Sequence, residues 1–119
     1  MQPSAVRKPL TRARIDLQMQ ASASEQQQRE LAAFVRFCVI RIERRLGASE
    51  RWTVKVDPAA VGYQSSVAMQ DGTLALESTG VGLDGTLAVW DALCRLERAL
   101  REARRPRSIR TPAERFDHG

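Results

Sequence analysis

The feature that most limits the fold is the dipeptide Asp71-Gly72, which lies between two segments of alternating hydrophobicity. Residues 63–69 and 73–78 each place apolar side chains at every second position, as half-buried strands do. A two-residue turn containing Gly accepts the positive φ that a tight hairpin requires. These two strands are therefore expected to be antiparallel neighbours. Residues 52–57, which also alternate, should join them in a meander.

Three further segments complete the pattern. Residues 14–20 alternate, with Ile15, Leu17 and Met19 on one face. Residues 25–46 carry a helical apolar stripe; Ser22 or Ser24 is the candidate cap, and Gly47 is a stop signal. Residues 86–105 form a second amphipathic helix that ends before Pro106. The stripe of the first helix consists of Leu31, Phe34, Val35, Cys38, Ile42 and Leu46.

The order β-α-β-β-β-α predicts an α+β protein with a four-stranded sheet and two long helices packed on one face. Each strand alternates, so the sheet has a single face to bury, and the helices cover it. The side chains expected on that face are Ile15, Leu17, Val54, Val56, Leu74 and Leu76.

The length of 119 residues fits one domain. We expect residues 1–13 to be a flexible basic arm or an organellar targeting segment, residues 14–105 to form the domain, and residues 106–119 to be a mobile basic tail. No apolar run approaches the roughly 20 residues of a membrane span. Two cysteines, Cys38 and Cys94, make no disulfide framework and favour a cytoplasmic location.

Residues 80–85 match the G-x-G-x-x-G pattern of a dinucleotide-binding turn. The surrounding pattern does not fit, because the preceding strand enters through a hairpin and no strand follows the second helix. We therefore expect a flexible connector, with no affinity for NAD or ATP and no cofactor. Asp84 should lie near the helix N-terminus, where a carboxylate is favourable.

The sequence contains few side chains that could act in catalysis. His118 is the single histidine and lies near the C-terminus, so a Ser/His/Asp triad and a Cys/His metal site are both improbable. Asp71 and Asp84 lie at turns, where Asp is common. The sequence therefore predicts that the protein is not an enzyme and takes no small-molecule substrate.

The formal net charge of +5 is concentrated in particular elements, which favours an anionic partner, nucleic acid first. On the second helix, four arginines fall in one arc opposite the apolar seam, although Asp91 and Glu102 share that arc. On the first helix, Arg36 and Arg44 lie away from the stripe and two more arginines flank them. A solvated charged face is the alternative, but few of these arginines have an acid four residues earlier. The predicted RNA-binding residues are Arg36, Arg41, Arg44, Arg45, Arg95, Arg98, Arg101 and Arg105.

Apolar residues are also expected on the outer helix surface. Phe37 and Ile40 lie on the outer side of the first helix and Trp90 belongs to the second. These side chains could contact a partner protein or a nucleobase, or belong to the core. A protein-interaction module is therefore the second functional hypothesis.

Two helical signatures resemble the ribosome hibernation promoting factor family, which includes the ribosome-associated inhibitor RaiA. The first joins Leu31-Ala-Ala-Phe34-Val35 to Arg41-Ile42-Glu43 and the strand beginning at Trp52. The second runs from the strand Leu74-Ala-Leu76-Glu77-Ser78 through Asp84 and Ala88-Val89 to Leu93, Arg95-Leu96, Arg98 and Leu100.

The resemblance implies a translation inhibitor that binds the small ribosomal subunit and its rRNA in the decoding channel during stress. Arg41, Arg95 and Arg98 match basic family positions. Three places depart from the family pattern: the glycine common after the first strand is replaced around Met19-Gln20-Ala21, Trp90 replaces an expected acid, and Cys38 replaces a frequent lysine.

Overall fold

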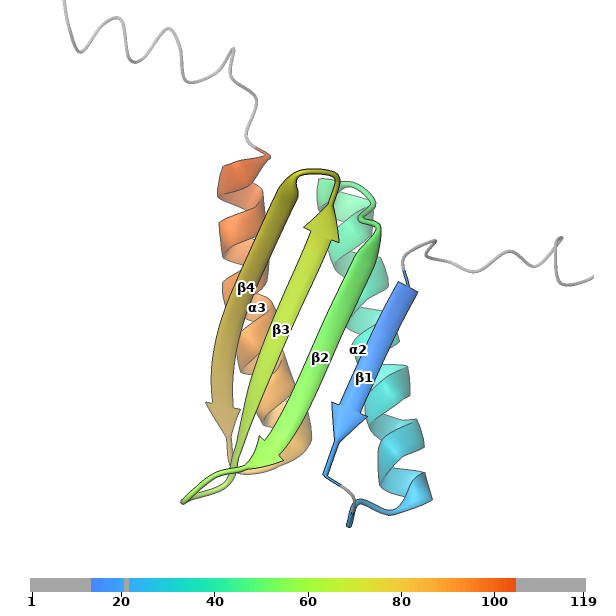
Figure 1. Cartoon of the computed structure of the whole chain (residues 1–119), viewed down its shortest axis with the longest axis vertical. Helices are drawn as coiled ribbons and strands as arrows, with labels where there is room; N and C mark the ends of the chain where they lie inside the picture. Colours follow the sequence, from blue (N-terminus) through green and yellow to red (C-terminus); the bar gives the residue numbers. More distant parts are fainter. Residues whose placement is uncertain (1–13, 21, 105–119) are drawn as a thin grey trace, which may run out of the picture.

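The computed structural model of the protein describes residues 14–20 and 22–104 (Figure 1). The expected arm and tail, and Arg105, lie outside the described residues. The elements are β1 (Arg14–Met19), α2 (Glu25–Leu46), β2 (Arg51–Pro58), β3 (Tyr63–Asp71), β4 (Leu74–Gly82) and α3 (Gly85–Ala103).

The strands form one sheet in the order β1-β2-β3-β4. β1 and β2 are parallel and joined through α2, while β2, β3 and β4 form an antiparallel meander. Asp71 pairs with Leu74 across the hairpin, and Gly72 adopts a φ of 63°, as the sequence predicts. The predicted fold class and element order are confirmed.

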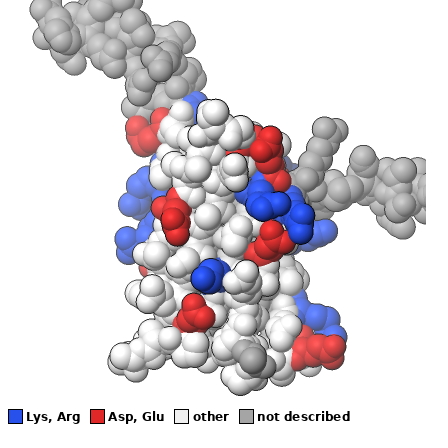
Figure 2. Space-filling view, viewed as in Figure 1, with Lys and Arg blue, Asp and Glu red and all other residues white. Residues whose placement is uncertain are grey.

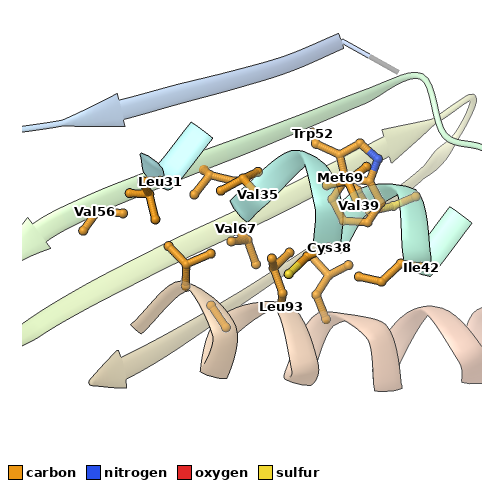
Figure 3. Packing of buried hydrophobic residues seen from close by; sticks show 14 of the residues in the cluster. Leu31, Val35, Cys38, Val39, Ile42, Trp52, Val56, Val67, Met69 and Leu93 are labelled. Carbon is orange, nitrogen blue, oxygen red and sulfur yellow. The ribbon is translucent and has the colours of Figure 1, made fainter. Parts of the chain in front are cut away.

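Both helices lie on the same side of the sheet and run in the same direction (Figure 1). Their inner side chains meet those of the strands in one mainly aliphatic core, which has the indole of Trp52 toward one end (Figure 3). Val35 from α2, Val67 from β3 and Leu93 from α3 are essentially inaccessible to solvent. The predicted inner sheet face is confirmed, with the edge-strand residues Ile15, Leu17, Leu74 and Leu76 partly buried.

A capping box fixes the start of α2. Ser24 Oγ accepts a hydrogen bond from Gln27 N at 3.0 Å, and Gln27 Oε1 accepts one from Ser24 N at 2.8 Å. The arrangement satisfies two backbone donors at the helix N-terminus and selects Ser24 over Ser22 as the cap. Gly47 ends the helix with a φ of 102°.

The interpretation of residues 80–85 as a flexible connector is wrong for its first half. β4 extends to Gly82, so Gly80 and Gly82 are strand residues facing α3. A Cβ on Gly80 would lie 2.3 Å from Ala92 N and 2.8 Å from Ala88 O. The glycines therefore allow the backbones of β4 and α3 to approach closely. Asp84 caps α3, as its position predicts, by accepting a hydrogen bond from Leu87 N at 2.8 Å.

The predicted exposure of Ile40 is also wrong, because this side chain is buried. Ile40 lies one turn before Glu43 on the same side of α2. The Glu43 carboxylate accepts hydrogen bonds from Trp52 Nε1 at 3.1 Å and from Ser49 N at 3.0 Å. That side of the helix therefore turns toward β2 and away from solvent. Val39, which the predicted stripe omits, is fully buried, whereas Phe34 and Leu46 are only partly buried.

Arg104 joins the ends of both helices to the hairpin. Its Nη1 donates to the carbonyl oxygens of Leu46 and Gly47, each at 2.8 Å. Its Nη2 donates to Ala48 O at 3.1 Å and pairs with Asp71 Oδ2 at 2.8 Å. The planar guanidinium thus satisfies carbonyls that the end of α2 leaves unpaired.

Replacing Arg104 with alanine should lower the free energy of unfolding by about 2 kcal/mol, because several partly buried acceptors lose a charged donor together. Lysine should recover part of this loss, since one ammonium group cannot reach both sets of acceptors. Urea denaturation measures the change. Arg101→Ala is the matched control, because the Arg101 side chain is 55% exposed. Equal losses for the two alanine variants would contradict this role.

Candidate nucleic-acid interface

The molecule has two broad faces of different charge. The sheet face that the helices leave open carries scattered charges of both signs between uncharged residues (Figure 2). Residues paired in register share a face, so the charged side chains of the open face can be assigned. They are Arg14, Arg51 and Lys55 and, of opposite sign, Asp16, Asp57 and Glu77. Three positive and three negative side chains leave the open face neutral.

Positive charge gathers instead toward the C-terminal halves of the two helices. Residues 36–46 and 95–104 together contain eight arginines and three glutamates, a net formal charge of +5. The helices are parallel, so these halves lie at the same end of the helix layer (Figure 1). We call their outward arginines the basic helix face, which consists of Arg41, Arg44, Arg45, Arg95, Arg98 and Arg101.

Glu97 joins the two helices within this face. Its Oε2 lies 2.8 Å from Arg45 Nη1 of α2 and 3.2 Å from Arg101 Nη2 of α3. The Glu97 side chain is only 10% exposed, whereas both arginine side chains are more than half exposed. One buried carboxylate therefore holds two guanidinium groups side by side at the surface, and their combined charge remains positive.

Arg95 points toward the opposite flank of α3. Its Nε lies 3.3 Å from Asp91 Oδ1, and Asp91 Oδ2 accepts a hydrogen bond from Val81 N at the edge of β4. That backbone hydrogen bond is the main reason that the pKa of Asp91 is lowered, and Arg95 adds to it. This pair, four residues apart on one helix, was not predicted from the sequence. The arc of arginines on α3 is thus divided between two flanks, since Arg101 turns toward α2.

Arg36, Arg44 and Arg98 are exposed and form no ion pair with other residues in the described part of the chain. Arg44 follows Arg41 by one turn and Arg98 precedes Arg101 by one turn, so each lies on the same side of its helix as an arginine near the helix junction. Arg36 lies five residues before Arg41, a spacing that places the two side chains on different sides of α2. The structure therefore does not bring Arg36 together with the arginines of α3. Arg105 lies outside the described residues.

An aromatic group occupies the junction between the helices. The ring of Trp90 packs against Phe34 with a centroid separation of 6.2 Å, and the guanidinium carbon of Arg41 lies 5.4 Å from its centroid. Trp90 remains 38% exposed and Phe37, on the outer side of α2, is 61% exposed. The structure thus confirms surface positions for Phe37 and Trp90, but not for Ile40.

Neither cysteine has the character of a nucleophile. Burial raises the pKa of the Cys38 thiol to about 11 and also raises that of Cys94. The thiolate is the reactive form, so both thiols are poor nucleophiles near neutral pH. Among the residues described, no group of three His, Cys, Asp or Glu side chains could hold a metal ion. Neither described helix has the length and apolarity that a bilayer crossing requires.

The fold and charge distribution define an α+β domain with a neutral open sheet and a basic helix layer. Solved structures share this fold. The Protein Y N-terminal domain of Thermus thermophilus matches with a TM-score of 0.63 and 15% identity, covering 77% of this chain and 99% of that chain. A ribosomal subunit interface protein from Coxiella burnetii matches with a TM-score of 0.60 and 15% identity, covering 76% of this chain and 96% of that chain. No protein-family model and no curated protein matches the sequence.

Proposed function

We propose that this protein binds the small ribosomal subunit through its basic helix face and inhibits translation by occupying the decoding channel. The observation that carries the proposal is the basic helix face on a fold shared with a protein described as a ribosomal subunit interface protein. The inhibition is steric and electrostatic. It requires no catalytic group and no cofactor, and the protein acts in the cytoplasm as a hibernation factor.

The arrangement of the arginines supports rRNA as the ligand. Guanidinium groups donate in a planar fork that suits phosphate oxygens. Arg45 and Arg101 are held in place by Glu97, so less side-chain entropy is lost when they meet a phosphate. Arg44 and Arg98 extend the same surface. Part of this charge also stabilises the C-terminal ends of the helix dipoles.

A protein-interaction module is the competing function, and the exposed side chains of Phe37 and Trp90 favour it. The burial of Ile40 weakens it, because the apolar surface is smaller than the sequence suggested. Apolar contact also differs from phosphate contact in its response to salt. This difference separates the two functions.

Co-sedimentation with purified small subunits over a range of salt concentrations tests the proposal. The logarithm of the binding constant should fall linearly with the logarithm of salt concentration, because phosphate contacts release bound counterions. The slope for single-stranded RNA is about −0.7 per contact, so four contacts predict a slope near −3. Salt-independent binding, or no binding to small subunits even at low salt, would refute the proposal.

A further inference from the structure

We infer that the Arg41–Trp90 pair is a stacking platform for an unpaired nucleobase, so that the basic helix face recognises looped or single-stranded RNA. This inference rests on the proposed function and deepens it. It names the chemical form of RNA that the face accepts. Charge alone would attract any RNA, paired or unpaired.

The geometry of the junction is the first argument. The guanidinium of Arg41 lies 5.4 Å from the ring centroid of Trp90, within the range of a cation–π contact. Phe34 packs against the same indole from α2, with an interplanar angle of 50°. Two side chains from the neighbouring helix therefore hold Trp90 in place. An immobilised indole and a planar guanidinium lose little conformational freedom when a base stacks on them.

Exposure is the second argument. The other tryptophan, Trp52, is fully buried and its indole N–H is bonded to Glu43. Trp90 leaves more than a third of its surface in solvent, beside partly exposed Arg41. The platform is thus open to a ligand.

The surrounding charge identifies the ligand. Arg45 follows Arg41 by one turn, about 6 Å along the helix axis. There Arg45 and Arg101 both pair with the Glu97 carboxylate. The exposed side chains of Arg44 and Arg98 lie near this pair. A flat apolar group flanked by clustered guanidinium groups complements a base flanked by phosphates. An apolar protein partner would have to bury these arginines, at a substantial desolvation cost.

The stacking requirement identifies the form of the RNA. Bases inside an A-form helix are stacked on each other and present only their edges, whereas unpaired bases can stack on aromatic rings and guanidinium planes. A platform on a convex helix layer can therefore engage a base only where the RNA is looped, bulged or single-stranded. Regular duplex RNA would contact the arginines alone.

The test compares a ten-nucleotide oligouridylate with an abasic oligonucleotide of the same length, which retains the phosphates. Base stacking is worth about 1–3 kcal/mol per base, so Trp90→Ala should weaken oligouridylate binding by roughly 5- to 150-fold. Binding of the abasic chain should not change. Trp90→Phe should retain most of the affinity. Arg41→Lys keeps the positive charge but lacks the planar guanidinium group. It should therefore weaken binding of the oligouridylate more than binding of the abasic oligonucleotide.

Fluorescence gives a second readout on the unmodified protein. Trp90 is exposed and Trp52 is not, so stacked bases should quench emission from Trp90. Oligouridylate should therefore quench the signal and the abasic chain should not. Unchanged oligouridylate affinity in Trp90→Ala, or an equal loss for both oligonucleotides, would overturn the stacking platform. Failure of the proposed function would appear separately, as wild-type protein that does not bind small subunits at any salt concentration.

Discussion

Replacing Gly80 with alanine should destabilise the protein by about 3 kcal/mol or more, because the added methyl group would overlap the backbone of α3. The added Cβ would lie 2.3 Å from Ala92 N and 2.8 Å from both Ala92 Cα and Ala88 O. These are backbone atoms of α3, which cannot move without displacing the whole helix. The core has no spare volume to absorb that shift, since Leu93 and Leu96 are fully buried beside it.

Gly85→Ala is the matched control, because it lies in the same glycine-rich segment. Its Cβ would meet Val56 Cγ1 at 3.4 Å, an ordinary contact, and alanine favours the helical conformation that Gly85 adopts. The control should be neutral or slightly stabilising. Thermal unfolding should place Gly80→Ala on the order of 10 °C below the wild type. If Gly80→Ala unfolds at the same temperature as the wild type, the close approach of β4 and α3 does not require glycine at this position.

The close packing of Gly80 against α3 could not be predicted from the local sequence. The glycine pattern at residues 80–85 predicts a flexible connector. It carries no information about the helix that packs against this part of the sheet. Gly80 is required by α3, which folds back onto β4 and brings Ala88 and Ala92, eight and twelve residues further along the chain, against this glycine. Asp84, in contrast, was predictable, because a helix cap depends only on the residues that follow it.

The candidate site shows the same difference between local features, which the sequence predicts, and contacts between elements, which it does not. The arginines were found from periodicity, since a wheel places each one relative to its own helix. The contact between the helices was not, because Glu97 reaches Arg45 across 52 residues, and neither was the contact of Arg104 with Asp71 across 33 residues. Ile40 was misplaced for a related reason: the wheel gives its angle, and only the packing of α2 against β2 decides what covers it. Strand alternation and the Asp71-Gly72 turn, which act locally, determined the sheet correctly.

Reversing the charge at Arg44 and Arg98 together should reduce small-subunit binding by at least about a hundredfold while leaving the fold intact. Each lost hydrogen bond to phosphate is worth about 1.5 kcal/mol or more, so two account for the change. These residues are preferable to Arg95, whose partner Asp91 also holds the edge of β4. Both are exposed, and the loss of a favourable helix-dipole contact at Arg44 should cost less than about 1 kcal/mol of stability.

The control for this variant is Arg51→Glu with Lys55→Glu on the open sheet face. Both double variants change the net charge from +5 to +1, so their long-range attraction to RNA falls equally. They differ only in the face that loses its cations. Co-sedimentation with small subunits should therefore show a large loss for the helix variant and a small one for the sheet variant, and only the helix variant should have a shallower salt dependence. Equal losses would mean that the protein responds to total charge, and that the basic helix face does not direct binding.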